Sequence, residues 1–191
     1  VTRQLRCFPR APNDSVDVVL SVNGIPVATV ELKNPLTGQT VEHGRAQYRA
    51  RDPRAPIFDF KRRALVHFTA DTERVLMTTR LAGAATHFLP FDRGQDGGAG
   101  NPPDPAGRSY RTAYLWEEVL ERDSLLDLLA RFVHLQVEEK RDDQGRRARA
   151  ETMIFPRYHQ LQAVRQLAGA ARAEGPGHNY LVEHSAGSGK S

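Results

Sequence analysis

The sequence predicts an α/β fold in which helices flank a sheet. Three observations predict it. Residues 17–33 and residues 64–80 each contain two apolar strand-like runs separated by turn residues. Residues 41–51, between these two hairpins, indicate a short helix that ends before Pro53. Residues 124–135 place five apolar side chains on one helical face, which indicates a helix packed against a core.

The first hairpin, DVVLSVNGIPVATVELK over residues 17–33, turns at Asn23 and Gly24. A two-residue loop would pair Asp17 with Val30 and bury a charge against valine. A three-residue loop, which also includes Ile25, leaves Asp17 opposite Glu31 on one face. The other face is then wholly apolar, with Val16 paired with Leu32, Val18 with Val30 and Leu20 with Ala28. We therefore prefer the three-residue loop.

This register brings three ionisable side chains together. Lys33 follows Glu31 by two residues and so lies on the face that carries Asp17 and Glu31. Two directly opposed carboxylates repel each other, so a divalent cation such as Mg²⁺ is expected between them, and the carbonyl of Leu32 could supply another ligand. Lys33 would orient and help deprotonate a water that attacks a phosphodiester. The alternative is an exposed strand in which Lys33 forms an ion pair with Asp14.

Length and composition fit a globular protein. The chain has 191 residues, of which 39% are hydrophobic and 26% charged, so we expect one medium domain and part of another. It has no apolar run near twenty residues and no signal-peptide pattern, so the expected location is cytoplasmic. The single cysteine, Cys7, excludes an internal disulfide, and the seven histidines lack the paired spacing of zinc ligands.

The net charge of +4 permits a polyanionic partner. Basic residues outnumber acidic ones in residues 42–63, directly after the predicted site. DNA contacts are therefore predicted from Arg45, Arg49, Arg51 and Arg54. The alternative is a solvated arginine-rich face.

The remaining elements divide the chain. His67 lies inside the second hairpin and is expected to be a core histidine. Residues 88–91 are expected to form a short strand, residues 92–107 a long mobile loop, and residues 114–120 and 124–135 two helices, with Ser124 as the N-cap of the second. Residues 137–152 indicate a linker or exposed hairpin. The predicted division is a nuclease domain over residues 1–136, the linker or hairpin over residues 137–152, and a further domain over residues 153–191.

Residues 153–191 show a second set of motifs. A helix to about residue 173 and a short strand over residues 179–183 precede HSAGSGKS, a Gly-rich loop of the phosphate-binding kind. HSAGSGKS resembles motif I of superfamily 2 helicases, and FPRYHQ resembles their Q-motif. ATP binding is therefore predicted from Tyr158, Gln160, Gly187, Gly189, Lys190 and Ser191. The chain stops at Ser191, so we expect it to hold only the truncated start of a RecA-like motor domain and not to hydrolyse ATP.

Asp17, followed by Glu31-Leu32-Lys33-Asn34, resembles the PD-(D/E)xK nuclease core of the motor or restriction (R, HsdR-type) subunit of type I restriction-modification enzymes. LVHFTADTERVLMTTRLAGAATHFLPFDRG is similar to the same subunit. In that family a Gln-x-x-x-Tyr motif supports the site, and here Gln47 matches the Gln while Arg51 stands at the Tyr position. The resemblance implies a restriction-endonuclease-like mixed sheet, Mg²⁺-dependent cleavage of unmodified double-stranded DNA, an ATP-driven motor, and methylation and specificity subunits as partners.

Two alternatives remain open at this point. The chain could belong to another helicase-nuclease fusion. It could also be a nuclease-like fold that has lost cleavage and serves as a DNA-binding or docking module for a motor. Retention of Asp17, Glu31 and Lys33 argues against the second alternative.

Overall fold

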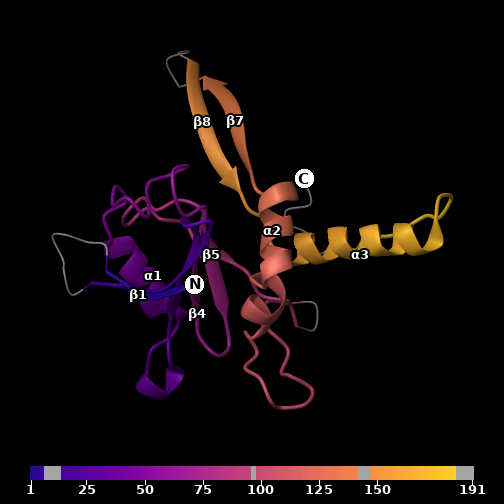
Figure 1. Cartoon of the computed structure of the whole chain (residues 1–191), viewed down its shortest axis with the longest axis horizontal. Helices are drawn as coiled ribbons and strands as arrows, with labels where there is room; N and C mark the ends of the chain where they lie inside the picture. Colours follow the sequence, from indigo (N-terminus) through magenta and orange to yellow (C-terminus); the bar gives the residue numbers. More distant parts are fainter. Residues whose placement is uncertain (7–13, 96–97, 142–146, 184–191) are drawn as a thin grey trace.

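The chain folds around a six-stranded mixed sheet, from which a two-stranded ribbon and a long helix extend (Figure 1). The computed structural model describes residues 1–6, 14–95, 98–141 and 147–183. The neighbouring strands of the sheet follow the order of the chain: β1 (Thr2–Leu5), β2 (Val16–Val22), β3 (Ile25–Leu32), β4 (Val66–Ala70), β5 (Val75–Thr78) and β6 (Leu89–Pro90).

Helical elements and the ribbon complete the chain. The 3₁₀ turn η1 (Pro35–Thr37) and helix α1 (Val41–Ala50) connect β3 to β4. After β6 come the π-helical turn η2 (Leu115–Val119), α2 (Arg122–Arg131), β7 (His134–Arg141), β8 (Arg147–Ile154) and α3 (Tyr158–Glu174). β7 and β8 pair antiparallel, so most of the segment predicted to be a linker or exposed hairpin forms a ribbon.

The parallel pair β3 and β4 sets the position of the polar cluster. The other strand pairs of the sheet are antiparallel within the described residues, whereas β3 and β4 run in the same direction and are joined by the crossover that contains α1. Their carboxyl ends therefore meet at one edge, where the Lys33 amide donates to the Ala70 carbonyl at 2.8 Å. Side chains that follow β3 are thus held beside β4 and α1.

The β2–β3 hairpin combines both registers considered for it. Val18 pairs with Val30 and Leu20 with Ala28, as predicted. Nearer the turn the register shifts by one, so the loop is the two-residue Asn23-Gly24 and the predicted three-residue loop is wrong. The shift leaves one extra residue on β3, which is the geometry of a β-bulge. A tight turn and an apolar face are therefore both possible.

The outer end of this hairpin also differs from the prediction. Val16 was expected to share a face with Val18 and to pair with Leu32. Instead, Val16 pairs with Leu5 of β1 and is fully buried in the cluster around Tyr48, while Leu32 is exposed. Addition of β1 as the edge strand gives Val16 an apolar partner.

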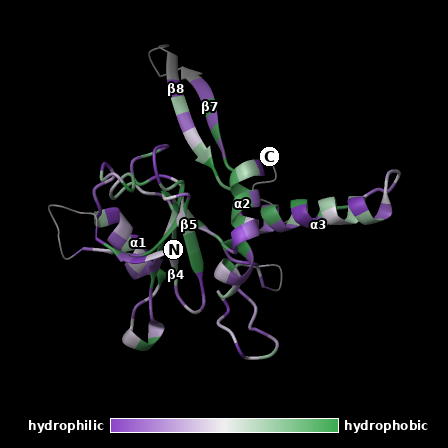
Figure 2. Ribbon diagram, in the orientation of Figure 1, coloured by the Kyte–Doolittle hydropathy of each residue, from purple (hydrophilic) through white to green (hydrophobic). Residues whose placement is uncertain are grey.

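Apolar residues form two clusters, and β5 is strongly hydrophobic (Figure 2). The larger cluster contains apolar side chains of β3, β4 and β5 together with residues of η2, α2 and α3. The smaller one packs α1 and the 55–58 turn against β2, through Val16, Val19, Tyr48, Ala55, Ile57, Phe58 and Leu81. Helix α1 contributes Tyr48 to the smaller cluster and no residue to the larger one. Its inward-facing side also reaches the polar end of β3, where Gln47 contacts Lys33.

Close contact holds α1 against β4. A Cβ atom built on Gly44 would lie 1.9 Å from Thr69 Oγ1, so only glycine fits there without movement. The Asp71 carboxylate, just after β4, accepts a hydrogen bond from the Val41 amide at 2.9 Å and so satisfies a free N–H of the first helical turn. The helix is thus fixed at both its start and its middle.

The segment after β6 is anchored rather than wholly loose. Residues 92–107 were expected to be too polar to pack, but Asn101 is buried. Its amide nitrogen donates to the Glu73 carbonyl and to Asp92, and its amide oxygen accepts from the Arg93 amide. Buried polar groups are tolerated when each is hydrogen-bonded, and these contacts meet that condition.

Two expectations about helix and strand ends are wrong. Ser124 lies inside α2, whose N-cap is Glu121, because the Glu121 carboxylate accepts from the amides of Asp123 and Ser124. Residues 179–183 form no strand in the described part of the chain, and residues 184–191 lie outside it. Among the described residues, no helix has the length and apolar character needed to cross a membrane.

Candidate active site

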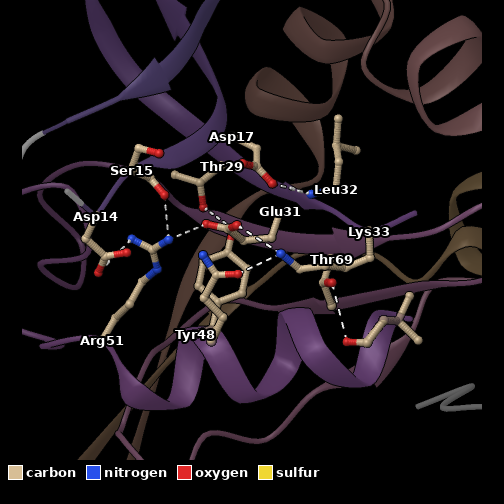
Figure 3. Close-up of polar contacts among 12 residues, drawn as sticks. Asp14, Ser15, Asp17, Thr29, Glu31, Leu32, Lys33, Tyr48, Arg51 and Thr69 are labelled. Carbon is tan, nitrogen blue, oxygen red and sulfur yellow. Dashed lines mark hydrogen bonds and ion pairs between the residues drawn. The ribbon is translucent and has the colours of Figure 1, made fainter. Parts of the chain in front are cut away.

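The predicted site residues of the first hairpin and of α1 meet at the end of β3 (Figure 3). β2 carries Asp17, β3 carries Glu31, and Lys33 follows directly. Gln47 and Arg51 are four positions apart and come from one side of α1 and its C-cap, as the helical period requires. Three separate elements therefore converge on one polar cluster.

Asp17 is held by both of its carboxylate oxygens. The Leu32 amide donates to Oδ2 at 2.9 Å, and the Gln4 side-chain amide donates to Oδ1 at 3.0 Å. Gln4 is itself oriented by the Ser15 hydroxyl, and its backbone has a φ of 52°, in the left-handed region that non-glycine residues seldom adopt. The carboxylate of Asp17 thus has a defined orientation at the sheet edge.

Glu31 is the buried centre of the cluster, with no exposed surface. Its Oε1 accepts a hydrogen bond from Arg51 Nη2 at 2.6 Å. Its Oε2 accepts no hydrogen bond from the residues that the structure describes, and Lys33 Nζ lies 3.7 Å away. The pKa of the Glu31 carboxyl is raised to about 8: burial is the main cause, the Asp17 carboxyl adds to it, and Arg51 and Lys33 oppose it. A proton or a cation would therefore stabilise the paired carboxylates.

Lys33 is mostly buried and points into the same cluster. Its Nζ donates to Gln47 Oε1 at 2.7 Å, so Gln47 lies in direct contact with the lysine. The alternative pairing of Lys33 with Asp14 is not the one formed, because Asp14 lies 3.8 Å from Arg51.

A buried hydrogen-bonded chain lies behind Glu31 on the same face of the sheet. Thr29 Oγ1 is 2.8 Å from the Tyr48 hydroxyl and 2.8 Å from His67 Nδ1. His67 is buried, as predicted for a core histidine, and burial lowers its pKa to about 3. Burial also raises the pKa of Tyr48 well above its ordinary value. Both rings therefore stay neutral and join α1 to β3 and β4.

Residues 1–86 match the family described as type I restriction enzyme R protein N terminus. The match confirms the resemblance drawn from Asp17, Glu31 and Lys33, and it contains every residue of the polar cluster. The comparisons with curated proteins and with solved structures gave no match.

The four arginines predicted to contact DNA lie in different environments. Arg45 forms an ion pair with Glu42, and Arg49 donates twice to the Thr86 carbonyl. Arg51 is buried beside Glu31 and so does not face a phosphate backbone, because its charge already has a carboxylate partner. Arg54 is exposed in the turn that follows α1.

The residues predicted to bind ATP are only partly described. Tyr158 is buried in the core, where its ring packs against those of Tyr114 and Phe91 at 5.0 and 6.0 Å. Gln160 Oε1 accepts from the Arg157 amide at 2.9 Å and caps α3. The predicted phosphate-loop residues Gly187, Gly189, Lys190 and Ser191 lie outside the described residues.

Sequence reasoning missed two partners of the carboxylates. The role of Arg51 could have been found from its spacing, because a residue four positions after Gln47 lies on the same helical side. Gln4 gave no comparable signal, since its contact with Asp17 depends on a left-handed backbone in β1.

Proposed function

We propose that residues 1–86 form the Mg²⁺-dependent endonuclease site of a type I restriction enzyme R subunit, which hydrolyses phosphodiester bonds of unmodified double-stranded DNA. One observation carries the proposal: beside Asp17, Glu31 presents a buried oxygen that accepts no hydrogen bond from the described residues, and the Lys33 ammonium lies next to it. A buried acceptor is seldom left unsatisfied, so this oxygen is the natural ligand for a cation.

The donor set fits a hard cation. Among the described residues no group of three or more His, Cys, Asp and Glu side chains surrounds one point. Two carboxylates with water or carbonyl oxygens are nevertheless a usual set for Mg²⁺, which keeps several waters. Asp17 and Glu31 would hold the ion, with Leu32 as a further candidate ligand. When bound, Mg²⁺ would supply positive charge for the phosphate and lower the pKa of a bound water.

The side chains of the chain itself then have separate tasks. Gln47 holds the Lys33 ammonium by a 2.7 Å hydrogen bond, which fixes its direction. Lys33 would orient the attacking water and stabilise the charge that develops on the phosphate. Three further predictions belong to this proposal: the start of a motor domain over residues 153–191, assembly with methylation and specificity subunits, and ATP binding through Tyr158, Gln160, Gly187, Gly189, Lys190 and Ser191.

The test is calorimetric titration of Mn²⁺, a stand-in for Mg²⁺, into the 191-residue chain. Asp17→Asn and Glu31→Gln are expected to abolish binding, because each removes a charged ligand. Glu42→Gln is the matched control, since Glu42 is an exposed carboxylate on α1 whose side chain pairs with Arg45. It is expected to bind Mn²⁺ as the unmodified chain does.

Cleavage is measured in parallel as nicking of supercoiled plasmid, with and without Mg²⁺. Loss of both binding and nicking in the two site variants, with the control unaffected, would support a metal-dependent nuclease. A folded chain that binds no Mn²⁺ would instead indicate a nuclease-like docking module.

A further inference from the structure

Arg51 has a position that the proposed cleavage chemistry does not explain. It is the C-cap residue of α1, where the backbone leaves the helix in an extended conformation. Its side chain turns inward and is almost completely buried (Figure 3). Long cationic side chains are rarely buried unless they are paired, so this placement needs a partner.

Several contacts fix the guanidinium group. Nη2 donates to Glu31 Oε1 at 2.6 Å and to the Ser15 carbonyl at 2.7 Å. The guanidinium carbon lies 5.9 Å from the centre of the Tyr48 ring and 5.6 Å from that of Phe58. A planar group that donates to two acceptors and lies beside two rings has little freedom to leave.

The consequence falls on Glu31. Its Oε1 is already bonded to a cation, so only Oε2 remains for a ligand. In centres with two metal ions, the ions lie about 3.5–4 Å apart, and such pairs are often bridged by a carboxylate that uses both of its oxygens. An ion on Oε1 would meet the guanidinium at close range, and two cations repel strongly in a buried site.

We propose that Arg51 is a positioning residue that holds Glu31 by Oε1 and restricts the centre to one divalent cation. The guanidinium supplies, as a fixed part of the protein, the positive charge that a second ion would bring. This inference rests on the proposed metal-dependent function and adds the number of ions and the residue that sets it.

The experiment combines calorimetry with electron paramagnetic resonance of Mn²⁺ bound to the 191-residue chain. The unmodified chain is expected to bind one Mn²⁺ with the spectrum of an isolated ion. Arg51→Met keeps a side chain of similar length against the two rings but removes the charge, so it is expected to bind two Mn²⁺ ions with the spectrum of a coupled pair. Arg51→Lys restores a cation and is expected to return the chain to one ion.

The outcomes separate this inference from the proposed function. A folded Arg51→Met variant that still binds one isolated ion would overturn the role of Arg51 and leave the nuclease proposal standing. A coupled pair in the unmodified chain would do the same, and this arm does not depend on the folding of any variant. Absence of Mn²⁺ binding in the unmodified chain would overturn both.

Discussion

Acid is expected to destabilise the fold through His67. The ring is buried against those of Tyr48 and Phe58, with its centre 5.8 and 5.4 Å from theirs, and burial lowers its pKa from 6.5 to about 3. Because the folded-state pKa is the lower one, the unfolded chain takes up a proton first. The contribution of His67 to stability is thus complete above about pH 6.5 and is lost as the pH falls toward about 3.

The size of this loss follows from the shift. One pKa unit corresponds to about 1.36 kcal/mol, so the full shift of His67 amounts to about 5 kcal/mol, of which roughly 2 kcal/mol is lost between about pH 6 and about pH 4.5. Urea unfolding followed by circular dichroism, at about pH 6 and about pH 4.5, measures it. Carboxyl groups also titrate in this interval, so the informative quantity is the difference between the unmodified chain and His67→Gln.

His67→Gln keeps a side chain that can bond Thr29 but does not titrate. Its free energy of unfolding is expected to fall by about 2 kcal/mol less than that of the unmodified chain over this interval. His87→Gln, at an exposed histidine, is the control and is expected to behave like the unmodified chain. Equal pH dependence in the unmodified chain and His67→Gln would refute the claim that a neutral buried His67 limits acid stability.

Three further predictions test other parts of the structure. Gly44→Ala is expected to lower the free energy of unfolding by about 1–3 kcal/mol in urea, because its Cβ would overlap Thr69, whereas Gly169→Ala in α3, with open space around it, is expected to be neutral or stabilising. Asn101→Ala is expected to cost about 1–3 kcal/mol and to speed thermolysin cleavage after β6; unchanged proteolysis would contradict the anchoring role of Asn101. Lys33→Ala is expected to abolish DNA cleavage by the complete enzyme while leaving ATP hydrolysis and DNA translocation nearly intact; equal loss of all three would show that Lys33 is structural.

Local patterns were enough to predict most of the sheet. Alternation of apolar residues identified β2 to β5, and Pro53 set the end of α1 to within one residue. The bulge was not predictable, because it reconciles a tight turn favoured by Asn23-Gly24 with an apolar face that needs the neighbouring register. The turn and the apolar alternation can each be recognised from a short stretch of sequence. The position of the bulge, in contrast, depends on how the two strands pair along their whole length.

The candidate site was predictable where chemistry follows spacing along the chain. Asp17, Glu31 and Lys33 lie on adjacent strands, so a correct register brings them together. The position of Arg51 depends instead on a carboxylate twenty residues earlier and on the packing of α1 over the sheet. An arginine in a basic segment was therefore assigned to DNA, although burial opposite Glu31 gives it a different partner.

Core packing contacts cross the predicted domain boundary near residue 152. Phe155, Tyr158 and Leu161 belong to the same apolar cluster as Phe68 and Phe91 of the sheet. The Phe155 ring lies 5.8 Å from that of Phe68 and 6.1 Å from that of Phe91. The first turn of α3 is thus part of the core that supports β4, while the rest of α3 extends outward (Figure 1). Because close-packed cores do not deform gradually, a displacement of α3 must either break these ring contacts or carry the sheet with it. The helix α3, which leads toward the predicted phosphate loop, therefore packs against β4, the strand that pairs with β3 next to Glu31.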